Sequence, residues 1–136
     1  MYKAKYYLPS LFFMTFIFYL SSRQRVEVSE VYLIQFAIFK TLHVIEYGFL
    51  YIINYRALKN LRRRPAWQNQ IDAFIITFFY AITDEIHQVF VPTREGRMRD
   101  IVIDLIGIIA ALWYIWEKLP KAQGKLKSWA NKLELV

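Results

Sequence analysis

Residues 71–91 read IDAFIITFFYAITDEIHQVFV, an apolar and aromatic run that is broken near its end by four polar side chains. The run is long enough for an α-helix that crosses a hydrocarbon layer of about 30 Å. A charge at the centre of such a helix costs roughly 2.5 to 3.5 kcal/mol on insertion scales. Charged groups in membranes mostly face the bundle interior and serve a function. The stretch therefore predicts a membrane helix and a site, whose first polar residues are Asp84, Glu85, His87 and Gln88.

Three further apolar runs predict an all-α bundle of four spanning helices. The predicted spans cover residues 6–22, 31–55, 71–91 and 100–116. The second span carries Lys40, His43 and Glu46, so it too is interrupted by charge. The first span follows two lysines and is short, a pattern that also describes a signal peptide. Because the residues around Ser22 lack a small-x-small cleavage site, we predict a retained span.

Composition fits a single small membrane domain. The chain has 136 residues, of which 57% are hydrophobic and 18% aromatic. The absence of cysteine excludes disulfides, thiolate metal sites and cysteine nucleophiles. The net charge of +7 lies mainly between the apolar runs, where it acts as a topology signal, so we expect no nucleic-acid partner.

The distribution of lysine and arginine predicts the orientation. Twelve of them fall in residues 1–5, 56–70 and 118–136, and five arginines fall in the other two connections. The positive-inside rule places both termini and residues 56–70 in the cytoplasm, and the 94–100 loop outside. The basic tail, residues 118–136, has Leu126, Trp129 and Leu133 at near-helical spacing. It fits an amphipathic helix on the inner leaflet, or equally a frayed, solvated tail.

Polar residues share one face on each of three spans. On the second span they are Lys40, His43, Glu46 and Tyr47. On the third they are Thr77, Tyr80, Asp84, His87 and Gln88, with Glu85 beside them. On the fourth, Asp100, Asp104, Gly107 and Ala111 line up, and the two small residues allow another helix to approach closely.

The polar residues of the three spans lie at similar depths along their helices, toward the outer leaflet. The arginines of the 94–100 loop lie at the same level and are fork-shaped donors suited to carboxylates or phosphates. We therefore predict one ligand-binding pocket. Its predicted residues are Lys40, His43, Tyr47, Asp84, Glu85, Gln88, Arg94, Arg97, Asp100 and Asp104.

A purely structural interpretation of the same residues is that they pair and fix the helix register. Lys40 would then pair with Asp84 or Glu85, and Arg94 or Arg97 with Asp100. One pair would suffice for register, however, and burying charge pairs is rarely a net gain in stability. General acid/base catalysis stays open, with Asp84, Glu85, Lys40 and His43 as candidates.

Metal and serine chemistry are less favoured by the pattern. A zinc site of His43, Asp84, Glu85 and His87 is chemically conceivable, but no metal-ligand spacing is present, and we expect no metal or cofactor. No serine is predicted at the level of the cluster within the spans. The near-interfacial position of His87 is typical of a solvated side chain.

The motif around these residues resembles the VanZ-like family of small bacterial membrane proteins. The similarity lies in TDEIHQVFVP (residues 83–92), Arg94-Glu95-Gly96, Asp100, Asp104 and Gly107, and upstream in Lys40, His43 and Tyr47. The family pattern is roughly D-E-x-x-Q-x-F-x-P-x-R-x-G, followed by two acidic or amide positions and a glycine. Thr93 stands where glycine is usual, and Asp104 where asparagine is common.

The resemblance implies a multi-pass protein of the bacterial cytoplasmic (inner) membrane with a role in the cell envelope. The founding member looks like an accessory factor that lowers sensitivity to the glycopeptide teicoplanin. We expect binding, with or without modification, of an anionic lipid or lipid-linked wall precursor. The alternatives are a proton- or ion-coupled carrier of small solutes and a membrane-embedded acid/base hydrolase or transferase. A homo-oligomer is compatible with all of these functions.

Overall fold

The computed structural model describes residues 3–24, 30–94 and 96–135, and within them every regular element is helical. Arg25 and Glu95, which entered the charge count and the family motif, lie outside these residues. The long helices are α1 (Ala4–Ser21), α2 (Tyr32–Leu61), α3 (Ala66–Val89) and α4 (Met98–Trp113). A π-helical segment (Tyr114–Lys118), a 3₁₀ turn (Leu119–Lys121) and α5 (Gly124–Lys132) follow.

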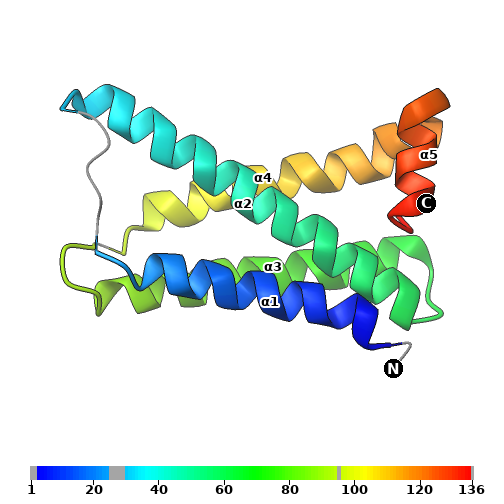
Figure 1. Ribbon diagram of the computed structural model, residues 1–136, viewed down its shortest axis with the longest axis horizontal. Helices are drawn as coiled ribbons and strands as arrows, with labels where there is room; N and C mark the ends of the chain where they lie inside the picture. Colours follow the sequence, from blue (N-terminus) through cyan, green and yellow to red (C-terminus); the bar gives the residue numbers. More distant parts are fainter. Residues whose placement is uncertain (1–2, 25–29, 95, 136) are drawn as a thin grey trace.

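The four long helices run alternately up and down the bundle (Figure 1). The start of α1, the α2–α3 connection and α5 lie at one end, and the α3–α4 connection lies at the other. This grouping agrees with the separation that the lysine and arginine count predicts. Pro65 precedes α3 and Pro92 lies in the α3–α4 connection, where a missing N–H does least harm.

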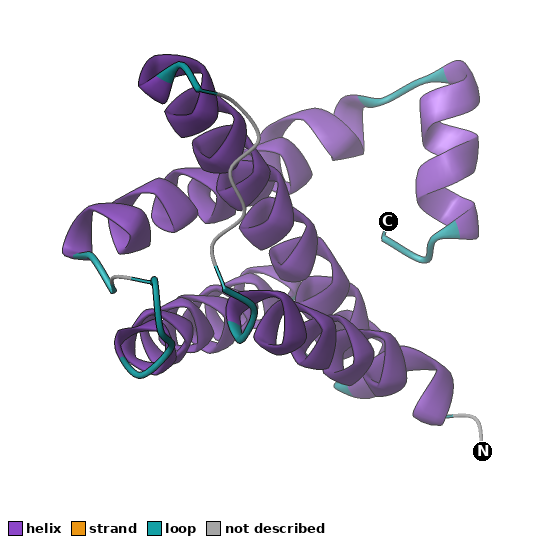
Figure 2. Cartoon of the chain, turned by 60° about the vertical axis from the view of Figure 1, so that its left-hand side comes forward, coloured by secondary structure: helices purple, strands orange, loops and turns teal. Residues whose placement is uncertain are grey.

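Helix α2 is the centre of the bundle, because it contacts α1, α3 and α4. Its side chains Tyr47, Leu50 and Tyr51 are fully buried. Seen from the turned view in Figure 2, α2 crosses the other helices rather than lying parallel to them. Interior polar groups are also present, and Asn54 donates to the Thr77 hydroxyl across α2 and α3 at 3.0 Å.

A close crossing joins α2 to α4. A Cβ atom added at Gly107 would lie 2.2 Å from the carbonyl oxygen of Val44, so only glycine fits there. One turn further on, Gly48 faces Ala111, with its ideal Cβ 3.8 Å from the Ala111 Cβ. The prediction that the small residues of the fourth span allow a close helix approach is confirmed.

The helices extend beyond the predicted apolar spans. Helix α2 continues to Leu61 rather than Tyr55, and α3 begins at Ala66 rather than Ile71. The reason is that helix formation needs only continued backbone pairing, which basic and polar residues sustain outside an apolar layer. Among the described residues one helix, α2, is by itself long and apolar enough to cross a membrane. The four-span arrangement therefore stays a prediction.

The tail forms α5 instead of a frayed segment, and its end returns to the bundle. Arg56 Nε donates to the carbonyl oxygen of Leu133 at 2.7 Å, and Arg56 Nη2 donates to Glu134 at 2.9 Å. Lys5 Nζ contacts the other Glu134 oxygen at 3.0 Å. The three apolar side chains noted in the sequence, Leu126, Trp129 and Leu133, are exposed.

Candidate functional site

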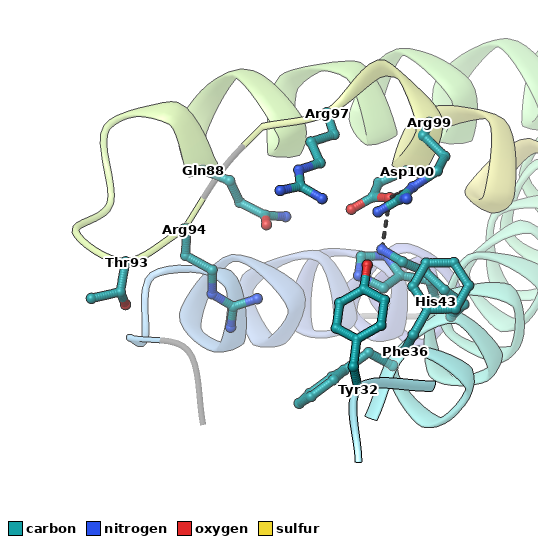
Figure 3. Close-up of a pocket in the computed structure, with 11 residues that line it drawn as sticks. Tyr32, Phe36, His43, Gln88, Thr93, Arg94, Arg97, Arg99 and Asp100 are labelled. Carbon is teal, nitrogen blue, oxygen red and sulfur yellow. Dashed lines mark ion pairs between the residues drawn. The ribbon is translucent and has the colours of Figure 1, made fainter. Parts of the chain in front are cut away.

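A polar cavity of about 140 Å³ lies between the first half of α2, the end of α3 and the start of α4 (Figure 3). Its wall contains most of the cationic residues that the sequence assigns to the site. The lining residues are Tyr32, Phe36, Phe39, Lys40, His43, Gln88, Thr93, Arg94, Arg97, Arg99 and Asp100. In Figure 3 the labelled residues of α2 lie on one side, and those of α3, the α3–α4 connection and the start of α4 lie on the other.

Two ion pairs join α2 to α4 at the cavity. Lys40 Nζ lies 2.6 Å from Asp100 Oδ1, and His43 Nδ1 lies 2.9 Å from Asp104 Oδ1. The pairing of Lys40 with Asp84 or Glu85, which the purely structural interpretation assigns, is therefore wrong. The physical reason is the glycine crossing, which packs α4 so closely on α2 that the acids of α4 reach Lys40 and His43 first.

Asp104 is the most deeply buried acid of the site, with a side chain that is 1% exposed. Its Oδ1 accepts from His43, while its Oδ2 has no hydrogen-bond partner among the described residues. Tyr47 lies one turn below His43, with the two rings stacked at 6.5 Å. Tyr47 is fully buried and does not line the polar cavity, so it supports His43 rather than facing a ligand.

One acid of α3, Glu85, organises the α3–α4 connection. The Arg97 backbone N–H donates to Glu85 Oε2 at 2.8 Å, and the Gln88 amide donates to Asp84 at 2.9 Å. Gly96 makes the first contact sterically feasible, because a Cβ there would lie 2.4 Å from the Glu85 carbonyl oxygen. Glu85 and Gly96 of the motif thus hold the connection against α3, whereas the Asp84–Gln88 contact lies within α3.

Arg94 links this connection to α1. Its Nε donates to the Arg23 carbonyl oxygen at 2.9 Å, and its Nη2 donates to the Leu20 carbonyl oxygen at 3.1 Å. The last carbonyls of a helix have no partner within it and carry partial negative charge, so a guanidinium is favoured there. Arg94 therefore anchors the end of α1, and it also lines the polar cavity.

His87 lies on the side of α3 that faces α1. Its ring stacks on Phe18 with centroids 4.3 Å apart, and its Nε2 lies 2.9 Å from the Ser22 hydroxyl. His87 stays partly exposed, whereas the expectation that no serine reaches this level is wrong. Ser22 also lies 2.6 Å from the Phe18 carbonyl oxygen, to which it donates. Its hydroxyl then accepts from His87, which does not suit a nucleophile activated by a base.

The described residues contain no group of three or more acids and histidines placed to hold a metal ion. His43, Asp84, Glu85 and His87 do not converge, since His43 pairs with α4 and His87 contacts α1.

A second, larger space was not predicted. It measures about 500 Å³ and lies chiefly between α1 and α2, with Phe39, His43, Gln88 and Arg94 lining both spaces. Glu46 and Asp84 line only this second space. The aromatic residues Phe36 and Phe39 were also missed, although they precede Lys40 and His43 by a helical turn. That spacing was the available signal.

Comparison with protein families matches residues 3–119 to the VanZ/LLP1 family model. The chain belongs to the VanZ/LLP1 family. No curated protein and no solved structure matches it significantly. The VanZ/LLP1 match spans every predicted site residue, from Lys40 to Asp104, and ends before α5.

The VanZ/LLP1 cavity has an excess of positive charge. Among the described residues, four basic side chains line it, namely Lys40, Arg94, Arg97 and Arg99, against the single carboxylate of Asp100. Asp100 is shared, because Arg99 Nε lies 3.5 Å from the same oxygen that Lys40 contacts. Guanidinium groups favour planar, multidentate recognition of carboxylate and phosphate. The arrangement is chemically suited to an anion.

Proposed function

We propose that this VanZ/LLP1 chain is a four-span protein of the bacterial inner membrane whose polar cavity binds the anionic headgroup of a lipid or lipid-linked wall precursor at the outer leaflet. The single observation that carries the proposal is the cationic excess of the cavity, four basic side chains against one acid among the residues that the structure describes. Through such a ligand, the protein would influence susceptibility to glycopeptide antibiotics such as teicoplanin, as the family resemblance implies.

The outer surface supports placement in lipid. Large apolar side chains are exposed on all four long helices, among them Phe12, Leu33, Phe79 and Ile106. Polar side chains such as Thr77 and Asp104 are instead fully buried. Soluble monomers rarely expose contiguous apolar surface on this scale. Helix α4 alone is short, about 24 Å for its 16 residues, but the π-helical segment that follows extends it.

The test is lipid retention by the purified protein. We expect native mass spectrometry to show phosphatidylglycerol retained over phosphatidylcholine from mixed nanodiscs. The double variant Arg97→Gln/Arg99→Gln should lose this preference by at least about tenfold, because a single charge-assisted hydrogen bond already contributes about 1.5 to 3 kcal/mol.

The matched control is Lys125→Gln/Lys127→Gln on α5, which removes the same charge at the other end of the molecule. This control should keep the preference. Equal losses in the two double variants would contradict a specific headgroup site and leave only a general effect of net charge.

One observation favours acid/base chemistry on the bound ligand as a second candidate. His43 lines the cavity and pairs through Nδ1 with the buried Asp104, an arrangement that orients an imidazole for proton transfer. Under this candidate, His43→Gln would retain the bound lipid while abolishing any turnover of it, whereas a binding-only protein would yield no product with either form.

A further inference from the structure

The space between α1 and α2 is a groove whose lining surface is mostly apolar, with Glu46 and Asp84 as its acidic residues. Phe13, Phe16 and Ile17 of α1 face Leu42 and Ile45 of α2 across it. Its volume of about 500 Å³ lies within the range of small-molecule sites. Phe16 and Leu42 are about half exposed, at 44% and 52%, so the groove opens sideways toward the bilayer.

The groove adjoins the polar cavity. Phe39, His43, Gln88 and Arg94 belong to the walls of both spaces, so the two spaces lie side by side. The polar end of the groove lies at the end of α1, where Arg23 and Arg94 line it. From there the groove follows α1 back to Phe13, about 12 Å at 1.5 Å per residue.

We propose that the α1–α2 groove holds one hydrocarbon chain of the same anionic amphiphile whose phosphate headgroup lies in the polar cavity, an inference that rests on the proposed function. The ligand class is thus a lipid phosphate that inserts a single chain between two helices. The polar cavity matches the headgroup of such a molecule and the groove matches its chain, and the cations lie at the headgroup end.

The polar cavity and the groove contribute differently to the binding free energy. Lipid chains are as apolar as leucine, so moving a chain from the bilayer into the groove gives little net free energy. The headgroup contacts therefore supply the affinity. The groove supplies selectivity for chains that fit between α1 and α2, and it fixes the depth at which the headgroup lies.

The experiment locates the chain by fluorescence quenching. The protein is placed in phosphatidylcholine nanodiscs that contain a few mole per cent of an alkyl phosphate brominated along its single chain. Phe16→Trp introduces a reporter in the groove, and Phe79→Trp introduces a matched reporter on the outer face of α3. The two positions have similar depth, because Tyr80 donates to the carbonyl oxygen of Met14. The quenching of the native tryptophans is measured in the unsubstituted protein and subtracted.

We expect saturable quenching in Phe16→Trp, at least twofold stronger than in Phe79→Trp at the same mole fraction. Adding Arg97→Gln/Arg99→Gln to Phe16→Trp should reduce quenching to the Phe79→Trp level. Retention of the alkyl phosphate is measured in parallel by native mass spectrometry. Arginine-dependent retention with equal quenching at both positions would overturn the groove assignment and leave the headgroup site standing. Absence of retention would overturn both proposals.

Discussion

Gly107 shows how a single residue sets the geometry of the site. Because an added Cβ would meet backbone rather than a movable side chain, Gly107→Ala must push α4 away from Val44. We expect a loss of about 1 to 3 kcal/mol in stability, the usual cost of overpacking. Thermal unfolding in detergent, followed by circular dichroism, measures it. Ala110→Val, which enlarges an exposed position of the same helix, is the control. Equal midpoints for the two variants would contradict the close crossing.

At the same scale, the sequence predicts the identity of the site residues, but it does not predict which of them contact one another. The cost of charge in lipid pointed to Lys40, His43, Asp100 and Asp104, and these four form the two ion pairs. Their pairing was not predictable, since it depends on helix rotation and on which helix approaches α2 most closely. The contact between Gln88 and Asp84 lies within α3 at a spacing of four residues, and so was readable from the sequence.

At the scale of elements, the contact between α2 and α4 explains the spacing of the motif residues. Both helices run in the same direction, and residues 40, 43 and 48 of α2 meet residues 100, 104 and 107 of α4 in order. Steps of three to five residues keep every contact on one face of each helix. The apolar groove left no comparable pattern, because its width depends on the separation of α1 from α2.

Helix α5 yields a pH-dependent prediction. The Lys5 hydrogen bond, with that of Tyr6 and the charge of Arg56, holds the pKa of Glu134 below its ordinary value of 4.5. A lowered carboxyl pKa means that the contact contributes fully above pH 4.5 and is lost as the pH falls through the lowered pKa. The distance between spin labels at Ser128→Cys and Arg63→Cys should therefore increase, or its distribution broaden, only below about pH 4.5. In Glu134→Gln the broad distribution should be present at pH 7 as well. An unchanged distance in that variant would show that Glu134 does not hold α5.

The whole molecule separates charge between its two ends, and this separation predicts its orientation. Twelve lysines and arginines lie in the segments at the end that holds α5, and four described arginines (Arg23, Arg94, Arg97 and Arg99) lie at the other end. The positive-inside rule then puts the polar cavity outside. Because the chain has no cysteine, single cysteines can be labelled without background. In spheroplasts, a membrane-impermeant maleimide should label Met98→Cys at once and Arg63→Cys only after permeabilisation. Ile75→Cys, in the middle of α3, should resist labelling in both states. Labelling of Arg63→Cys before Met98→Cys would reverse the orientation and place the cavity at the inner leaflet, where no extracellular wall precursor could reach it.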